Sequence, residues 1–149
     1  MLTAQEIMTR EVVSVTVDTS LKDLAHKFME TRYSNMPVLD QAGKLVGVIS
    51  ETDLIEQQQP LHIPTVMAFF DGVFYLDSEK RFKEEVARVT ATTVGELCRR
   101  KPVTCSPTAS VREIAALMAK NKAHLLPVIE NDKMIGVVAR LDLIRAMEE

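Results

Sequence analysis

Apolar residues follow two different spacings in the first third of the chain. Four of them recur every three or four positions, as on the buried face of one helix: Leu21, Leu24, Ala25 and Phe28. The apolar runs 36–39 and 45–49 are short and flank a turn at Ala42 and Gly43. Such runs are typical of two strands joined by a hairpin, and we expect a closing helix from near Thr52.

The same pattern returns in the last third of the chain. Its helical face is formed by Val111, Ile114, Ala115 and Met118. The runs 126–129 and 134–138 predict a second hairpin, followed by a second closing helix. When residues 3–55 are laid over 93–144, with one residue omitted near Gly43, 14 of 52 paired positions are identical. Typical composition gives about 3 identities by chance, so the sequence predicts a duplicated unit.

Each unit has two expected helix starts in which a hydroxyl residue precedes an acidic residue by three positions. Thr3–Glu6 and Thr93–Glu96 predict capping boxes. A second, weaker pair begins at Ser20 and Ser110. These starts place one helix at the beginning of each unit and one before each hairpin.

Two further features occur once in each unit. One is a Pro-Val pair at the start of the middle strand, at Pro37 and Pro127; the other is the run 47–53, Gly-Val-Ile-Ser-Glu-Thr-Asp, with its counterpart at 136–142. With the order strand, helix, strand, strand, helix, they resemble the CBS family, whose run is Gly-x-x-Ser/Thr-x-x-Asp. The resemblance covers both units but not the stretch 56–92.

The resemblance implies an α+β fold, an α/β sandwich in which two β-α-β-β-α CBS motifs pack as a pseudo-twofold pair. CBS motif 1 would span residues 3–57 and CBS motif 2 residues 93–149. Residues 58–92 would form a linker or insert, and the two motifs would make one combined domain.

The run that ends at Asp53 also suits a nucleotide chemically. Ser50 and the free amides at the start of a helix can bind phosphate, and the two carboxylate oxygens of Asp53 can accept hydrogen bonds from both hydroxyls of a ribose. The structural alternative is that Asp53 and Asp142 only cap their helices, because aspartate is a favoured residue there.

The family implies two clefts, each lined by both motifs. The first would combine Ser50, Asp53, Ser106, His124, Leu125 and Leu126. The second would combine Thr16, Ser34, Asn35, Met36, Arg140 and Asp142. Ala139 stands where the first run has Ser50, so we rank the Asp53 cleft first. Arg140 either replaces the lost phosphate ligand or is solvated. His124 either meets phosphate when protonated or is a packed polar side chain.

The composition limits the partners. The formal net charge is −3, whereas nucleic acid and anionic lipid require a basic face. The chain begins without a signal-peptide pattern, so we expect a cytoplasmic protein. Cys98 and Cys105 suit reduced core positions, and the three histidines are scattered, so we expect no metal site.

The segment 61–76 is strongly apolar, and four of the five phenylalanines lie between Phe69 and Phe82. It contains Pro, Asp and Gly and is shorter than the ~20 residues of a membrane span. It is either a linker packed on its own domain or a dimer contact. From Asp77 onward, apolar spacing predicts a short amphipathic helix.

The resemblance therefore implies a regulatory, ligand-sensing module and not an enzyme. It would bind adenine nucleotides or adenosyl compounds (AMP, ADP, ATP or S-adenosylmethionine) between the motifs and transmit energy or metabolite state to an effector protein. We expect a homodimer, no nucleic acid and no catalytic cofactor. The alternative is a structural dimerisation module with degenerate, ligand-free clefts.

Overall fold

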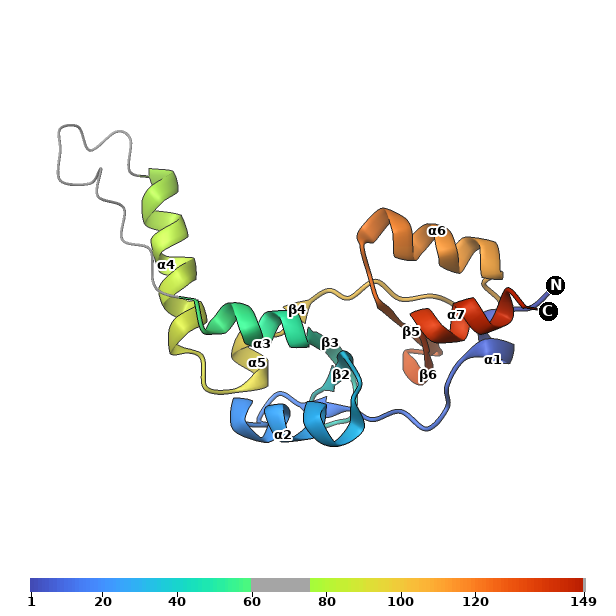
Figure 1. Ribbon diagram of the computed structural model, residues 1–149, viewed down its shortest axis with the longest axis horizontal. Helices are drawn as coiled ribbons and strands as arrows, with labels where there is room; N and C mark the ends of the chain where they lie inside the picture. The colour runs from blue at the N-terminus through green and yellow to red at the C-terminus, as the bar shows by residue number, and fades with distance from the viewer. Residues whose placement is uncertain (60–75, 149) are drawn as a thin grey trace.

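The computed structural model describes residues 1–59 and 76–148, and the elements of the first motif lie in the predicted order (Figure 1). They are β1 (Val15–Thr16), α2 (Leu21–Thr31), β2 (Asn35–Leu39), β3 (Leu45–Ser50) and α3 (Glu51–Gln57). Strand β2 pairs parallel with β1 and antiparallel with β3. Gly43, in the hairpin turn, has a φ of +83°, which a glycine adopts without strain.

The second motif repeats these elements. They are α6 (Val111–Asn121), β5 (Leu125–Glu130), β6 (Lys133–Ala139) and α7 (Arg140–Ala146). Strands β5 and β6 form an antiparallel hairpin, and Cys105 pairs parallel with Val128 in the place that β1 takes in the first motif. The α+β prediction is confirmed.

The two motifs exchange the segments at their starts. Helix α5 (Val94–Leu97) leads into β4 (Arg99–Arg100), which pairs antiparallel with β3 of the first motif. Helix α1 (Ala4–Ile7) leads to Thr9, which bridges to Val137 on β6 of the second motif. Each sheet therefore ends on backbone that belongs to the other repeat.

The hydrophobic cores follow the exchange. Ala4 and Met8, from the start of the first repeat, lie in the core of the second motif with Ile114 and Leu126. Val94, from the start of the second repeat, lies in the core of the first motif. Each core is therefore completed by a segment of the other repeat, and burial of these side chains contributes to the stability of both motifs.

Capping boxes are found at Thr3 and at Ser110, one in each of the two predicted pairs. Ser20 and Ser110 each accept a hydrogen bond from the amide three residues ahead, at 3.0 and 3.1 Å. The hydroxyls of Thr3 and Thr93 instead donate to the glutamates three residues ahead, both at 2.9 Å. The serine pair caps long helices, whereas the threonine pair begins helices of four residues.

Helix α4 (Leu76–Thr90) confirms the amphipathic helix expected from Asp77, whereas the rest of the apolar segment 61–76 lies outside the described residues. Arg88 and Val89, near the end of α4, are hydrogen-bonded to the end of α3 through the Glu56 carbonyl and the Gln57 side chain. Within the described residues, none of the helices has both the length and the apolar character needed to cross a membrane.

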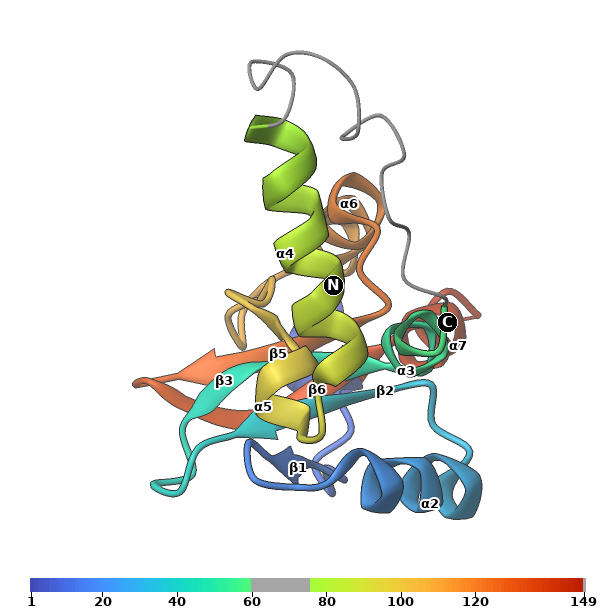
Figure 2. The same ribbon diagram turned by 90° about the vertical axis from the view of Figure 1, so that its left-hand side faces the viewer.

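The strands of the two motifs meet in the middle of the molecule, where β2 contacts β5. Helix α2 covers one side of this layer and α6 the other (Figure 2). Helices α3 and α7 lie along one common face. This arrangement brings the end of each hairpin near residues of the other motif.

Candidate functional site

Two cavities lie between the motifs at equivalent positions. The Asp53 cavity, of about 430 Å³, joins the start of α3 to β4 and to the segment before β5. The Asp142 cavity, of about 300 Å³, joins the start of α7 to residues 9–13 and to the segment before β2. Both reach the roughly 300–1,000 Å³ of ordinary small-molecule sites.

Asp53 is buried at the start of α3, with 6% of its surface exposed. Its Oδ2 accepts a hydrogen bond from the Ser50 amide at 2.8 Å, and the Asp53 amide donates to Ser50 Oγ at 3.1 Å. Its Oδ1 accepts a hydrogen bond from Arg99 Nε on β4 at 3.0 Å. Asp53 therefore does cap its helix, as the structural alternative expected from the sequence.

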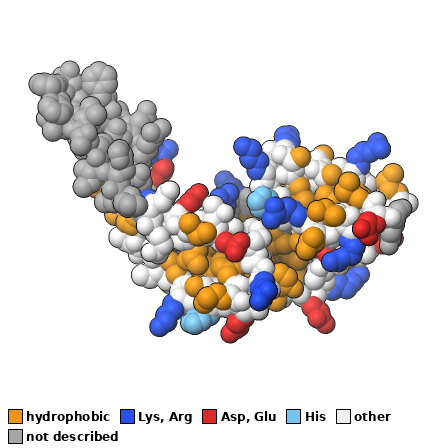
Figure 3. All heavy atoms as spheres, viewed as in Figure 1, with side chains coloured by type: hydrophobic (Ala, Val, Ile, Leu, Met, Phe, Trp, Pro, Cys, Tyr) orange, Lys and Arg blue, Asp and Glu red, His pale blue; other side chains and the backbone are white. Residues whose placement is uncertain are grey.

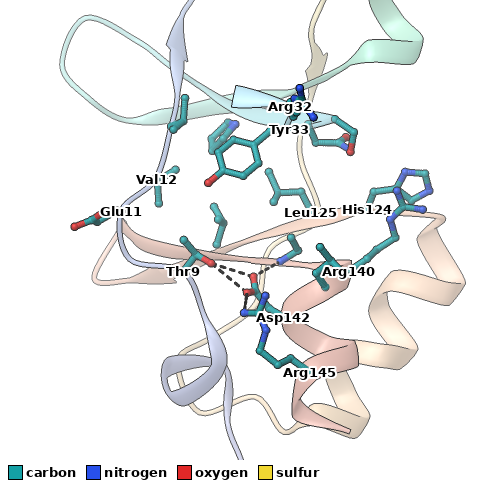
Figure 4. A pocket seen from close by; sticks show the side chains of 17 residues that line it. Thr9, Glu11, Val12, Arg32, Tyr33, His124, Leu125, Arg140, Asp142 and Arg145 are labelled. Atoms are coloured by element: carbon teal, nitrogen blue, oxygen red, sulfur yellow. Dashed lines mark hydrogen bonds and ion pairs between the residues drawn. The ribbon is translucent and has the colours of Figure 1, made fainter. Parts of the chain in front are cut away.

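Asp142 is held in the same way at the start of α7, but its partners differ (Figure 4). Its Oδ2 accepts from the Ala139 amide at 2.8 Å. The Thr9 hydroxyl contacts both carboxylate oxygens, at 3.1 and 3.2 Å. Arg145, one turn along α7, lies 3.6 Å from Oδ1.

Glycine at the start of each aspartate run allows these contacts. A Cβ on Gly47 would overlap the Arg99 carbonyl oxygen, and a Cβ on Gly136 would come within 2.9 Å of the Thr9 carbonyl oxygen. Only glycine lets the exchanged backbone approach so closely. The approach brings Arg99 to Asp53 and Thr9 to Asp142.

The linings of the cavities differ in charge. Among the described residues that line the Asp53 cavity, Asp53 is the one carboxylate, and the cations are Arg99, Arg100, Lys101 and Lys122. The Asp142 cavity has three cations and two carboxylates: Arg32, Arg140, Arg145, Glu11 and Asp142. The first cavity is therefore the more favourable site for a multiply charged anion.

Three of the cations lie on backbone in the left-handed region. Arg32 and Lys122 end α2 and α6 with φ of +60° and +51°, and Lys101 follows β4 with φ of +60°. This conformation costs roughly 1–2 kcal/mol for a residue with a Cβ, and glycine is the usual residue in it at helix ends. The chain instead has cations here, on the lining of the cavities.

Most of the expected site residues reach the cavities. Ser50, Asp53, His124 and Leu125 line the Asp53 cavity. Ser34, Asn35, Arg140 and Asp142 line the Asp142 cavity. His124, Leu125 and Asn35 line both.

Four expected residues, Leu126, Met36, Thr16 and Ser106, are not among the described residues that line the two cavities. Leu126 and Met36 are fully buried in the two cores. Thr16 is exposed and contacts Thr19, and Ser106 is exposed and contacts Thr108. Met36 and Leu126 lie directly before the prolines with their side chains in the cores, whereas their neighbours Asn35 and Leu125 line the cavities.

The sequence prediction missed the contribution of the exchanged segments. Arg99 and Lys101 belong to a run of three cations before Pro102, and this run was the available signal. Tyr33 directs its ring into the Asp142 cavity, opposite Asp142, where the Asp53 cavity has Ala123 (Figure 4). Within the described residues, no group of three or more His, Cys, Asp or Glu side chains is placed to hold a metal ion.

Comparison with known proteins identifies the family. The model of the CBS domain matches residues 4–59 and 94–149, so the chain belongs to the CBS domain family and carries two CBS motifs. The uncharacterized protein MJ1426 of Methanocaldococcus jannaschii is 30% identical over 96% of this chain and 89% of its own length. The next two curated relatives are longer, and the matched region covers 43% and 15% of them.

Solved structures share the fold. CBSX2 in complex with AMP has a TM-score of 0.82 at 23% identity, with 99% of this chain and 97% of that chain covered. The CBS domain pair of protein MJ0100, in complex with 5′-methylthioadenosine and S-adenosyl-L-methionine, has a TM-score of 0.70 at 17% identity, with 99% and 97% covered. The pseudo-twofold CBS pair is thereby confirmed as the architecture.

Proposed function

We propose that this chain is a regulatory module that binds adenine nucleotides or adenosyl compounds in its two cavities and transmits their level to an effector protein. The observation that carries the proposal is the pair of equivalent cavities. Each combines a buried aspartate of one motif with residues of the other, so a ligand in either cavity would contact both motifs. Ligand binding would then change how the motifs pack.

The chemistry of the cavities suits such a ligand. A carboxylate offers about four lone-pair sites. Asp53 uses them for the Ser50 amide and for Arg99, which leaves acceptor capacity for ribose hydroxyls. The cations can meet phosphate, and the ring of Tyr33 can stack on a base. The fold neighbours crystallised with AMP and with adenosyl compounds support the same ligand class.

The proposal is tested by calorimetry with AMP, ADP, ATP and S-adenosylmethionine, with thermal unfolding in parallel. We expect micromolar binding and a melting temperature that rises with ligand concentration by mass action. Absence of both heat and melting shift at millimolar ligand would contradict the proposal.

Asparagine variants separate the ligand role of each aspartate from its capping role. Asp53→Asn and Asp142→Asn keep a side-chain oxygen for the backbone amide but lose the charge. We expect Asp53→Asn to remove most of the measurable affinity, because the Asp53 cavity keeps Ser50 and has more cations. A larger loss in Asp142→Asn would reverse this ranking.

The second candidate is a structural dimerisation module without ligands. It is favoured by the capping contacts of both aspartates and by Ala139, which has no hydroxyl for phosphate. It predicts a melting temperature that does not respond to nucleotide. In both candidates we propose a homodimer without catalytic activity, and a cytoplasmic location stays a prediction from the sequence.

A further inference from the structure

The two cavities differ in the residue that the exchanged segment brings to their aspartate. Arg99 and Thr9 occupy equivalent positions in the repeat, and each contacts the aspartate beside it. Asp53 is paired with the Arg99 guanidinium at 3.0 Å, whereas Asp142 accepts a hydrogen bond from the neutral Thr9 hydroxyl at 3.1 Å and has the Arg145 guanidinium 3.6 Å away, on its own helix. The same ligand would therefore meet a different obstacle in each cavity.

Arg99 opposes one class of ligand and favours another. A ligand that offers only ribose hydroxyls to Asp53 shares the buried carboxylate with Arg99, which weakens the ion pair and gives the guanidinium no new anion in return. A phosphate offers the guanidinium a new anion, which it can bind with two parallel hydrogen bonds. The Arg99 side chain is 68% exposed, so it is free to turn from Asp53 toward the cavity that it lines.

We infer that the Asp53 cavity selects phosphate-bearing adenosine ligands over unphosphorylated ones, with Arg99 moving from Asp53 to the phosphate on binding. This inference rests on the proposed function. Three further cations line the cavity: Arg100, Lys101 and Lys122. Affinity should therefore rise with the number of phosphates. The Asp142 cavity, with Tyr33 and an added carboxylate at Glu11, suits adenosyl ligands of lower negative charge.

The test exchanges the two equivalent residues. Arg99→Thr gives Asp53 the hydroxyl that Asp142 has at the equivalent position, and Thr9→Arg does the reverse. The amides of Ser50 and Ala139 report on the two cavities separately when nuclear magnetic resonance follows titrations with adenosine, AMP, ADP and ATP. Lys44→Thr is the matched control, because it removes one exposed cation from the β2–β3 turn, outside the residues that line either cavity.

At the Asp53 cavity of the wild type, we expect ATP to bind at least about tenfold more tightly than adenosine, as one charge-assisted contact can provide. Arg99→Thr should weaken ATP and strengthen adenosine, so that the ratio of their affinities falls by about tenfold or more. Thr9→Arg should raise this ratio at the Asp142 cavity. Lys44→Thr should leave both ratios unchanged.

Other results overturn the inference. If Arg99→Thr weakens ATP and adenosine equally, or leaves their ratio unchanged, Arg99 does not select. The inference also fails if ligands shift the resonance of the Ala139 amide alone, because the Asp53 cavity then binds no ligand. If no ligand shifts either amide, the proposed function fails with it.

Discussion

Gly47 and Gly136 are equivalent in the repeat, but they face different neighbours. A Cβ on Gly47 would meet the main chain of Arg99, which is fixed by the β3–β4 pairing. A Cβ on Gly136 would first meet Met8 Sδ, at 2.6 Å. A methionine side chain can move, whereas a paired backbone cannot without loss of its hydrogen bonds.

Gly47→Ala should therefore destabilise the protein more than Gly136→Ala. We expect Gly47→Ala to lower the free energy of unfolding by about 1–3 kcal/mol, the usual cost of overpacking, and to displace β4 with Arg99. Urea denaturation of both variants measures the difference. Equal losses would show that the Thr9 carbonyl, 2.9 Å from the Gly136 position, matters as much as Arg99.

The buried thiol of Cys105 makes the free energy of unfolding depend on pH in the alkaline range. Burial raises the pKa of its thiol from 9.0 to about 11. Below pH 9 the thiol is protonated in both the folded and the unfolded state. Between pH 9 and about 11 the unfolded chain loses the proton first, so this contribution to folding stability declines as the pH rises.

The expected decline at pH 10.5 is about 2 kcal/mol relative to pH 8. Lysines and tyrosines also titrate in this range, so the informative quantity is the difference between the wild type and Cys105→Ala in urea denaturation at both pH values. The variant should lack this part of the decline. Parallel pH curves would mean that burial does not hold the thiol in its protonated form.

At the level of the elements, the repeat predicted the helices and hairpins of both motifs but not which copy each starting segment packs on. Ala4 and Val94 are both small apolar residues at the same position of a short helix, and both are fully buried. Either could fill either core, because the hydrophobic effect is not directional. The exchange is decided by chain geometry, which a pattern of residue types does not contain.

The same limit applies to the site. The aspartate runs lie within one motif and could be predicted as local sequence. Arg99 contacts Asp53 across 46 residues of chain and Thr9 contacts Asp142 across 133, so their partners depend on the exchange. Tyr33 and Ala123 occupy equivalent positions but are different residues. Identical positions of the repeat therefore give no information about this difference between the cavities.

Because of the exchange, Val94→Ala should destabilise the first motif, although Val94 belongs to the second repeat in sequence. Its side chain is fully buried in the first core, so truncation should cost about 2 kcal/mol. Hydrogen exchange should quicken in α2 and β2 more than in α6 and β5.

Two truncations inside the motifs calibrate this result. Leu24→Ala in the first core should quicken the same amides as Val94→Ala, and Ile114→Ala in the second core should quicken the other set. If Val94→Ala resembles Ile114→Ala instead, the starting segments are not exchanged in solution.

At the scale of the whole molecule, one face carries α3 and α7, and hydrophobic side chains gather across its middle (Figure 3). Ile55 on α3 and Ile144 on α7 are equivalent in the repeat and are 69% and 56% exposed. A face that is itself nearly twofold symmetric suits a second copy of the same chain, since a twofold dimer places the same patch on both sides of its interface.

Ile144→Glu should therefore break the proposed homodimer. Each copy of a twofold dimer would carry the new carboxylate into an apolar contact, so the change acts twice and leaves charges without partners. Light scattering at micromolar concentration should give twice the 16.7 kDa of one chain for the wild type and the single mass for the variant. Met29→Glu is the control, because Met29 is an apolar residue on α2 that is at least as exposed as Ile144. A monomeric wild type would contradict the dimer, and a Met29→Glu variant that dissociates while Ile144→Glu stays paired would move the interface to α2.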